Sequence, residues 1–168
     1  MSLDCYTEKG KRFISSQHKV EDLISQIFNV EVVTKNRDTE KYDADIFKNG
    51  ILKAVCEIKT REFWSRLSGS WFTFEKMKSD RYMISHSKLK KLKEKSENHG
   101  IISCIFLHIP YEKKIVYIKT TDKKGNFLID FYVKRTKTKK TCNDEKGYIW
   151  RDNAFIKYDS NIFKVFNY

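Results

Sequence analysis

The chain has 168 residues, of which 40% are hydrophobic and 14% aromatic, which is enough for one packed core despite 33% charged residues. The four cysteines are widely spaced, which indicates neither a zinc site nor a disulfide framework, and no apolar stretch is long enough to cross a bilayer. A net charge of +12 favours a polyanionic partner such as nucleic acid, unless the lysines only keep the surface soluble. We therefore expect a reduced, cytoplasmic protein with no membrane segment.

The first predicted element is an amphipathic helix over residues 12–28. Its apolar side chains recur at spacings of three and four, the period of one helix face. These side chains are Phe13, Ile14, Val20, Leu23, Ile24, Ile27 and Phe28. A strand is predicted over residues 30–34, and the two elements together begin an α/β pattern.

A β-hairpin is predicted next, with strands over residues 41–47 and 51–59 joined by Lys48-Asn49-Gly50. Residues 60–81 are polar and aromatic, which indicates a loop or a short helix bordering a functional site. A helix with a very basic exposed face is predicted over residues 87–98, and Gly100 is placed to end it.

The C-terminal half is predicted to consist mainly of strands. Residues 101–109 are almost continuously apolar, which is typical of a strand buried on both faces. Further strands are expected over residues 114–119, 127–133, 155–158 and 162–166, and the basic run 134–140 is expected to be a solvated turn. The sequence therefore predicts one α/β domain over residues 1–168, with a mixed central sheet flanked by helices.

The predicted hairpin carries charged side chains whose faces decide what they can do. Side chains two apart on a strand share a face, so Glu57 and Lys59 point together, as do Asp43 and Asp45. A regular two-residue turn would put these acids on opposite faces, whereas an odd-length turn or a bulge would put them on one face. Two carboxylates and an ammonium on one face can bind a divalent metal and orient a water. We therefore predict an odd-length connection or a bulge, with Gly50 at positive φ.

A third carboxylate, that of Glu21, lies on or beside the apolar stripe of the first helix. A charge at the edge of a core-facing stripe is costly unless it is compensated. A metal or a basic partner would compensate it, and a side chain that reaches past the stripe to solvent would avoid the cost.

These residues, in this order, resemble the PD-(D/E)XK nuclease superfamily, the restriction-endonuclease-like and Holliday-junction-resolvase-like enzymes. The resemblance covers residues 12–61: a helix with Glu21, a strand with Asp45 before two apolar residues, and a return strand with Glu57-Ile58-Lys59. The basic helix and the strand over residues 101–109 follow in the order of the family core. Ala44 stands where the family often has proline, and Asp43 is a rival to Asp45 as the metal-binding aspartate.

The resemblance implies a restriction-endonuclease-like fold and a DNA endonuclease that uses Mg²⁺ or Mn²⁺. Asp45, Glu57 and the carbonyl of Ile58 would hold the ion, with support from Glu21. Lys59 would orient or help to deprotonate the attacking water and stabilise the transition state. Open at this point are the DNA site or structure that is cut, DNA against RNA, one ion against two, and whether the chain forms a homodimer.

Other basic and aromatic residues are candidates for contact with nucleic acid. Arg61 continues the strand of Lys59, and lysines of the basic helix are spaced to follow a phosphate backbone. The helix residues concerned are Lys88, Lys91 and Lys95. Two other classes of function fit the same sequence: a non-catalytic nucleic-acid-binding protein and an inactive nuclease-fold assembly module. Metal binding by the acids would distinguish the nuclease from both.

Overall fold

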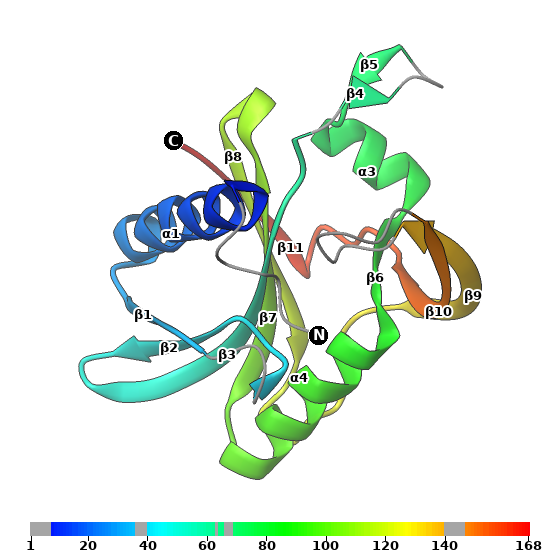
Figure 1. Ribbon diagram of the computed structural model, residues 1–168. Helices are drawn as coiled ribbons and strands as arrows, with labels where there is room; N and C mark the ends of the chain where they lie inside the picture. The colour runs from blue at the N-terminus through cyan, green and yellow to red at the C-terminus, as the bar shows by residue number, and fades with distance from the viewer. Residues whose placement is uncertain (1–7, 36–39, 63, 66–68, 140–146) are drawn as a thin grey trace.

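The computed structural model describes residues 8–35, 40–62, 64–65, 69–139 and 147–168, and Figure 1 shows the arrangement of their elements. Within these ranges the chain is an α/β protein with three helices, a mixed six-stranded sheet and a three-stranded antiparallel sheet. A two-stranded ladder, β4 (Trp64–Ser65) with β5 (Ser70–Trp71), stands apart from both sheets (Figure 1). The described helices include none that is long and apolar enough to span a membrane.

The six-stranded sheet combines a meander of antiparallel strands with one parallel pair. Its strands, in spatial order, are β1 (Glu31–Thr34), β2 (Ala44–Lys48), β3 (Ile51–Thr60), β7 (Ile102–Ile109), β8 (Lys114–Thr121) and β11 (Phe163–Asn167). The pair β3–β7 is parallel, and all other neighbours are antiparallel. Parallel strands need a long crossover connection, and the segment between β3 and β7 contains α3 (Phe74–Asp80), β6 (Tyr82–Ser85) and α4 (His86–His99).

Two helices cover opposite faces of this sheet (Figure 1). Helix α1 (Glu8–Phe28) packs Val20 and Ile24 against a cluster that includes Cys56 of β3. Helix α4 packs Leu89 and Leu92 into a second cluster on the other face, with strand residues that include Val55, Ile105 and Leu107. Neighbouring residues of β3 therefore face different helices, and the expectation of a mixed sheet flanked by helices is confirmed.

The three-stranded sheet lies beside α4 and has the spatial order β6-β10-β9 (Figure 1). Strands β9 (Phe131–Lys139) and β10 (Tyr148–Ile156) form a long ribbon, and β6 pairs with the end of β10 that lies nearest the core. Tyr82, Ile84, Ala154 and Ile156 are buried in the cluster of α4. One face of the small sheet is therefore part of the main core.

The ribbon corrects three expectations. The predicted strand over residues 127–133 begins only at Phe131, and the basic run that was expected to be a turn continues that strand to Lys139. The reason is that much of the ribbon is exposed, so its lysines remain solvated and the strand forms without the free-energy cost of burying their charges. Thr136 and Thr138, which favour strands, alternate with those lysines. Strand β10 also begins at Tyr148, well before the predicted strand at 155–158.

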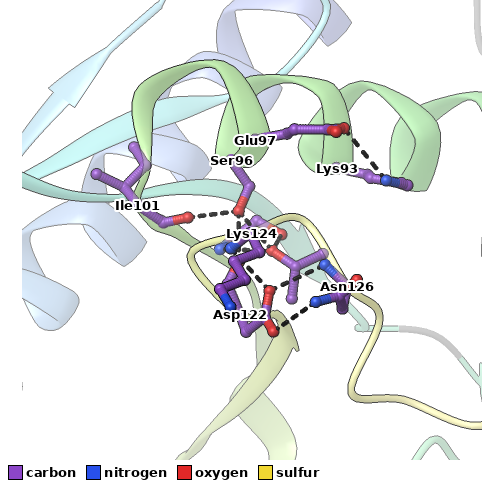
Figure 2. A network of polar contacts seen from close by, with 9 residues as sticks. Lys93, Ser96, Glu97, Ile101, Asp122, Lys124 and Asn126 are labelled. Carbon is purple, nitrogen blue, oxygen red and sulfur yellow. Dashed lines mark hydrogen bonds and ion pairs between the residues drawn. The ribbon is translucent and has the colours of Figure 1, made fainter.

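A buried polar network joins the end of α4 to the neighbouring strands (Figure 2). The Ser96 hydroxyl lies within hydrogen-bonding distance of the carbonyls of Ile101 and Asp122, and it accepts a hydrogen bond of 2.7 Å from Thr121. The Asp122 carboxylate in turn accepts hydrogen bonds from Asn126 in the turn that follows β8. Gly125 of this turn lies so close to α4 that a Cβ atom there would be 2.9 Å from the Cβ of Glu97.

We predict that Gly125→Ala destabilises the protein more than Gly50→Ala. Both glycines have positive φ, +78° and +70°, so either alanine carries the left-handed backbone cost of about 1–2 kcal/mol. Only at position 125 must the new methyl also push against α4, which should add roughly 1–2 kcal/mol. Urea unfolding measures both losses, and equal losses would show that the turn moves away from α4 at no cost.

Candidate functional site

The β2–β3 hairpin has a tight turn followed by a bulge. Asn49 and Gly50 have φ of 54° and 70° and join Lys48 to its partner Ile51. The register then shifts between Ile46 and Phe47, which leaves Lys53 as the extra residue of β3. The predicted bulge and the predicted positive φ of Gly50 are both confirmed.

This bulge places the acids of β2 on the face of Glu57. Asp45 is the register partner of Val55, and residues directly opposite in an antiparallel pair share a face. Asp43, Asp45, Val55, Glu57 and Lys59 therefore all lie on the side of the sheet that α4 covers. Without the extra residue, the acids of β2 would instead point toward α1.

Asp43 is the aspartate that the structure brings to Glu57 and Lys59. It immediately precedes Ala44, which pairs with Cys56, and one of its carboxylate oxygens accepts a hydrogen bond of 2.8 Å from the backbone N–H of Ile58. The Nζ atom of Lys59 lies 2.5 Å from Glu57 Oε1 and 3.7 Å from Asp43 Oδ2. One ammonium thus bridges two carboxylates that are 1% and 0% exposed.

Lys88, on the first turn of α4, supplies a second positive charge to the same carboxylate. Its Nζ atom lies 3.1 Å from Glu57 Oε2, so each oxygen of Glu57 has one lysine beside it. Burial by itself lowers the pKa of Lys59, but the charges of Glu57 and Asp43 outweigh it and hold that pKa above its ordinary value. The side chains of Lys59 and Lys88 are 31% and 27% exposed, so they lie between the buried acids and solvent.

Asp45 has partners of its own, which keep its carboxylate away from this cluster. It accepts a hydrogen bond of 2.7 Å from the Tyr42 hydroxyl and lies 2.7 Å from Nζ of Lys35. The sequence favoured Asp45 over Asp43 as the partner of Glu57, because apolar residues follow Asp45 directly. The structure instead joins Asp43 to Glu57 and Lys59, since β2 and β3 run antiparallel and the earlier residue of β2 meets the later residue of β3.

Glu21 does not reach the cluster. It is buried on α1, where its carboxylate contacts Gln17, His18 and Thr34 at 2.6–2.9 Å. Thr34 pairs with Ala44, whose side chain belongs to the α1 face of the sheet. The expected approach of Glu21 to Asp45 and Glu57 is therefore wrong, because the sheet separates them.

Tyr82 is a site residue that the sequence did not reveal. Its hydroxyl is buried and has no hydrogen-bond partner among the described residues. The ring lies close enough to the cluster for the charges of Lys59, Glu57 and Asp43 to act on its phenol, and burial is the largest of the influences that raise its pKa. A buried phenol thus lies near the acids, on the inner side of the small sheet. In the sequence, only the short hydrophobic run Tyr82-Met83-Ile84 could have signalled a strand there.

The residues predicted to contact nucleic acid have different partners in the structure. Lys88 is engaged with Glu57, as described, whereas Lys91 pairs with Glu94 and Lys95 pairs with Glu40. Arg61 leaves the end of β3 and lies over the ring of Tyr82 at 5.5 Å. These three lysines thus follow one side of α4, and each is paired with an acidic side chain of the protein.

The donors of the cluster fit a hard divalent cation. Mg²⁺ is typically held by one or two carboxylates and keeps several of its waters, and Asp43 and Glu57 supply two neighbouring carboxylates. The carbonyl of Ile58 points to the same side as its N–H, which donates to Asp43. The Tyr82 hydroxyl, which has no partner among the described residues, is free to bind a water or an oxygen anion. The described residues contain no group of three or more His, Cys, Asp and Glu side chains arranged around one point, so an ion here would rest on two carboxylates.

A scan against models of protein families and searches of curated proteins and of solved structures found no match to this chain. The fold and the cluster therefore define an α/β protein with a buried pair of carboxylates, a bridging lysine and a second lysine from the covering helix.

We predict that Lys88→Met destabilises the protein by about 1–3 kcal/mol, because it leaves one oxygen of a fully buried carboxylate without its positive partner. The matched control is Lys91→Met on the same helix, whose ion pair with Glu94 is on the surface and should contribute less than about 1 kcal/mol. Denaturant unfolding of both variants measures the difference. Equal effects would mean that Glu57 does not depend on Lys88.

Proposed function

We propose that this chain is a metal-dependent deoxyribonuclease with a restriction-endonuclease-like core, which hydrolyses phosphodiester bonds of DNA. The observation that carries the proposal is the pair of buried carboxylates, Asp43 and Glu57, beside the ammonium of Lys59. Apolar residues in the same place would commonly give equal or greater stability, so stability alone is a weak reason to bury two carboxylates beside an ammonium. A need to hold a cation beside a phosphate would explain directly why the two carboxylates are buried next to each other.

The order of elements supports the proposed family. A helix is followed by three antiparallel strands, and a second helix precedes a strand that is parallel to the third. The resemblance stated from sequence requires this order, with the aspartate on the second strand and Glu-x-Lys on the third. The two differences are that Asp43 takes the place expected for Asp45 and that Glu21 lies on the far face of the sheet.

Each residue of the cluster has a role that follows from its position. Asp43, Glu57 and the Ile58 carbonyl would hold the cation, which when bound would polarise the phosphate and make a water more acidic. Lys59 touches both carboxylates, so its ammonium would orient the attacking water and offset charge in the transition state. Tyr82 would donate its hydroxyl to that water or to a phosphate oxygen. Lys88 would move its charge from Glu57 to the phosphate when DNA arrives.

A non-catalytic nucleic-acid-binding protein is the second candidate, and one observation favours it. Both oxygens of Glu57 are already neutralised by lysines, so the cluster is electrostatically complete without a cation. In that case the basic surface would bind nucleic acid and the cluster would serve only to hold α4 against the hairpin.

Cleavage distinguishes the two candidates. The purified chain should cut DNA with Mg²⁺ or Mn²⁺ and be inactive in EDTA, in a screen of supercoiled plasmid, linear duplex, single strands and four-way junctions. Lys59→Ala should abolish cleavage and leave most of the affinity for DNA, because binding is spread over many basic residues. Cleavage that survives Lys59→Ala would come from another site or a contaminant, and binding without cleavage by the wild type would favour the non-catalytic candidate.

A matched pair of substitutions tests which aspartate acts. Asp43→Asn should lower the cleavage rate by at least about 100-fold, because a carboxylate that holds the cation is lost. Asp45→Asn makes the same chemical change two residues away and should stay within about threefold of wild type, since Asp45 contacts only Tyr42 and Lys35 in the described structure. Melting temperatures check that both variants fold. The reverse result would return the metal-binding role to Asp45.

A further inference from the structure

The small sheet has one face on which large hydrophobic side chains are exposed in the described structure. Its inner face, with Tyr82, Ile84, Ala154 and Ile156, is buried in the core. Met83 pairs in register with Phe155, and Phe155 with Tyr132, so these three side chains share the opposite face. We call this the outer face. Met83 and Tyr132 are exposed there, which leaves a sheet surface open to a partner.

Aromatic rings on the outer face are arranged as a stack. The rings of Phe155 and Tyr132 are 5.1 Å apart and nearly parallel, with an angle of 11° between them. The guanidinium of Arg81 lies over the ring of Tyr132 at 5.0 Å. Tyr132 is nevertheless 48% exposed. Flat groups in this arrangement offer what a nucleic-acid base needs for stacking, an aromatic ring and a guanidinium plane.

The charge of the outer face selects an anionic occupant. Lys134 is two residues beyond Tyr132 and Arg151 is four residues before Phe155, so both belong to this face. The acidic residue of the ribbon, Asp152, pairs with Arg135 on the opposite face. The outer face of the strands thus combines stacking groups with positive charge alone, a combination that binds single-stranded nucleic acid.

The outer face begins beside the proposed active site. Arg61 follows Lys59 by two residues, and its guanidinium lies 3.5 Å from the carbonyl of Met83 on β6. The same guanidinium lies over the ring of Tyr82, which is near the acids. Arg61 thus links the cluster to β6, an edge strand of the small sheet, and the stack of Phe155 and Tyr132 lies on the next two strands, β10 and β9.

We propose that the outer face binds unpaired nucleotides that adjoin the cleaved bond, so that the substrate is DNA with a single-stranded segment at the cut. Paired bases stack on each other and cannot offer their faces to Tyr132 and Arg81, which is why an intact duplex fits less well. The position of the cut rests on the proposed nuclease function. The binding of unpaired bases does not.

The test measures binding in EDTA, where the proposed nuclease is inactive and affinity alone is read. Fluorescence anisotropy compares a single strand of about 12 nucleotides with a blunt duplex of the same sequence. Tyr132→Ala should weaken single-strand binding by about tenfold or more and duplex binding by less than about twofold. Tyr132→Phe keeps the ring and should stay within about twofold for both.

Tyr111→Ala is the matched control for this substitution. Tyr111 is 60% exposed and stacks on Trp71 at 5.8 Å, so it makes the same kind of surface contact at a different place. Its loss should leave single-strand affinity within about twofold of wild type. Equal effects of the two alanine variants, or an equal loss for single strand and duplex, would overturn the proposal.

Two further measurements separate this proposal from its alternatives. Sedimentation velocity of Tyr132→Ala shows whether the outer face instead holds a second copy of the chain, since a dimer that dissociates in this variant would overturn the proposal. With Mg²⁺, a forked duplex should be cut faster than the blunt one, and Tyr132→Ala should remove that preference. If nothing is cut but single-strand binding depends on Tyr132, the nuclease function fails and the binding site stands.

Discussion

Burying Asp43 and Glu57 beneath α4 is possible only if positive charge is brought to them, and this constraint ties together three parts of the structure. Strand β3 supplies Lys59, which bridges both carboxylates, and the first turn of α4 supplies Lys88. The Lys53 bulge puts the acids on the correct face. Because each charge depends on the others, the hairpin, the helix and the sheet must be positioned together.

The two faces of the main sheet differ in the side chains that they carry. The α1 face is apolar, with Val20 and Ile24 packed on Cys56 and its neighbours, and it serves stability. The α4 face carries the buried charges among apolar neighbours. Glu21 belongs to the first face, where Gln17, His18 and Thr34 satisfy its carboxylate. Its burial therefore has a local explanation that requires neither a metal nor a substrate.

The small sheet links the candidate active site to a surface. On its inner side lies the buried Tyr82 hydroxyl, which has no hydrogen-bond partner among the described residues, and on its outer side Tyr132 stacks on Phe155 and has the Arg81 guanidinium over its ring. Alternation along a strand produces both effects, because neighbouring residues such as Tyr82 and Met83 point in opposite directions. Under the proposed function, the two faces of this sheet would contribute one to the chemistry and the other to binding.

The sequence by itself determined the elements whose apolar residues are strongly periodic, such as the first helix and the buried strand Ile102–Ile109, together with the Glu57-Ile58-Lys59 motif. It did not reveal the outer part of the ribbon, because the exposed, lysine-rich residues there have no buried face and therefore no apolar pattern. Only the tertiary structure decided that Asp43 meets Lys59 and Glu57, that Glu21 lies behind the sheet and that Tyr82 is buried near the cluster. The physical reason is that side chains alternate with a period of two, so one extra residue, Lys53, reverses the face of every side chain beyond it.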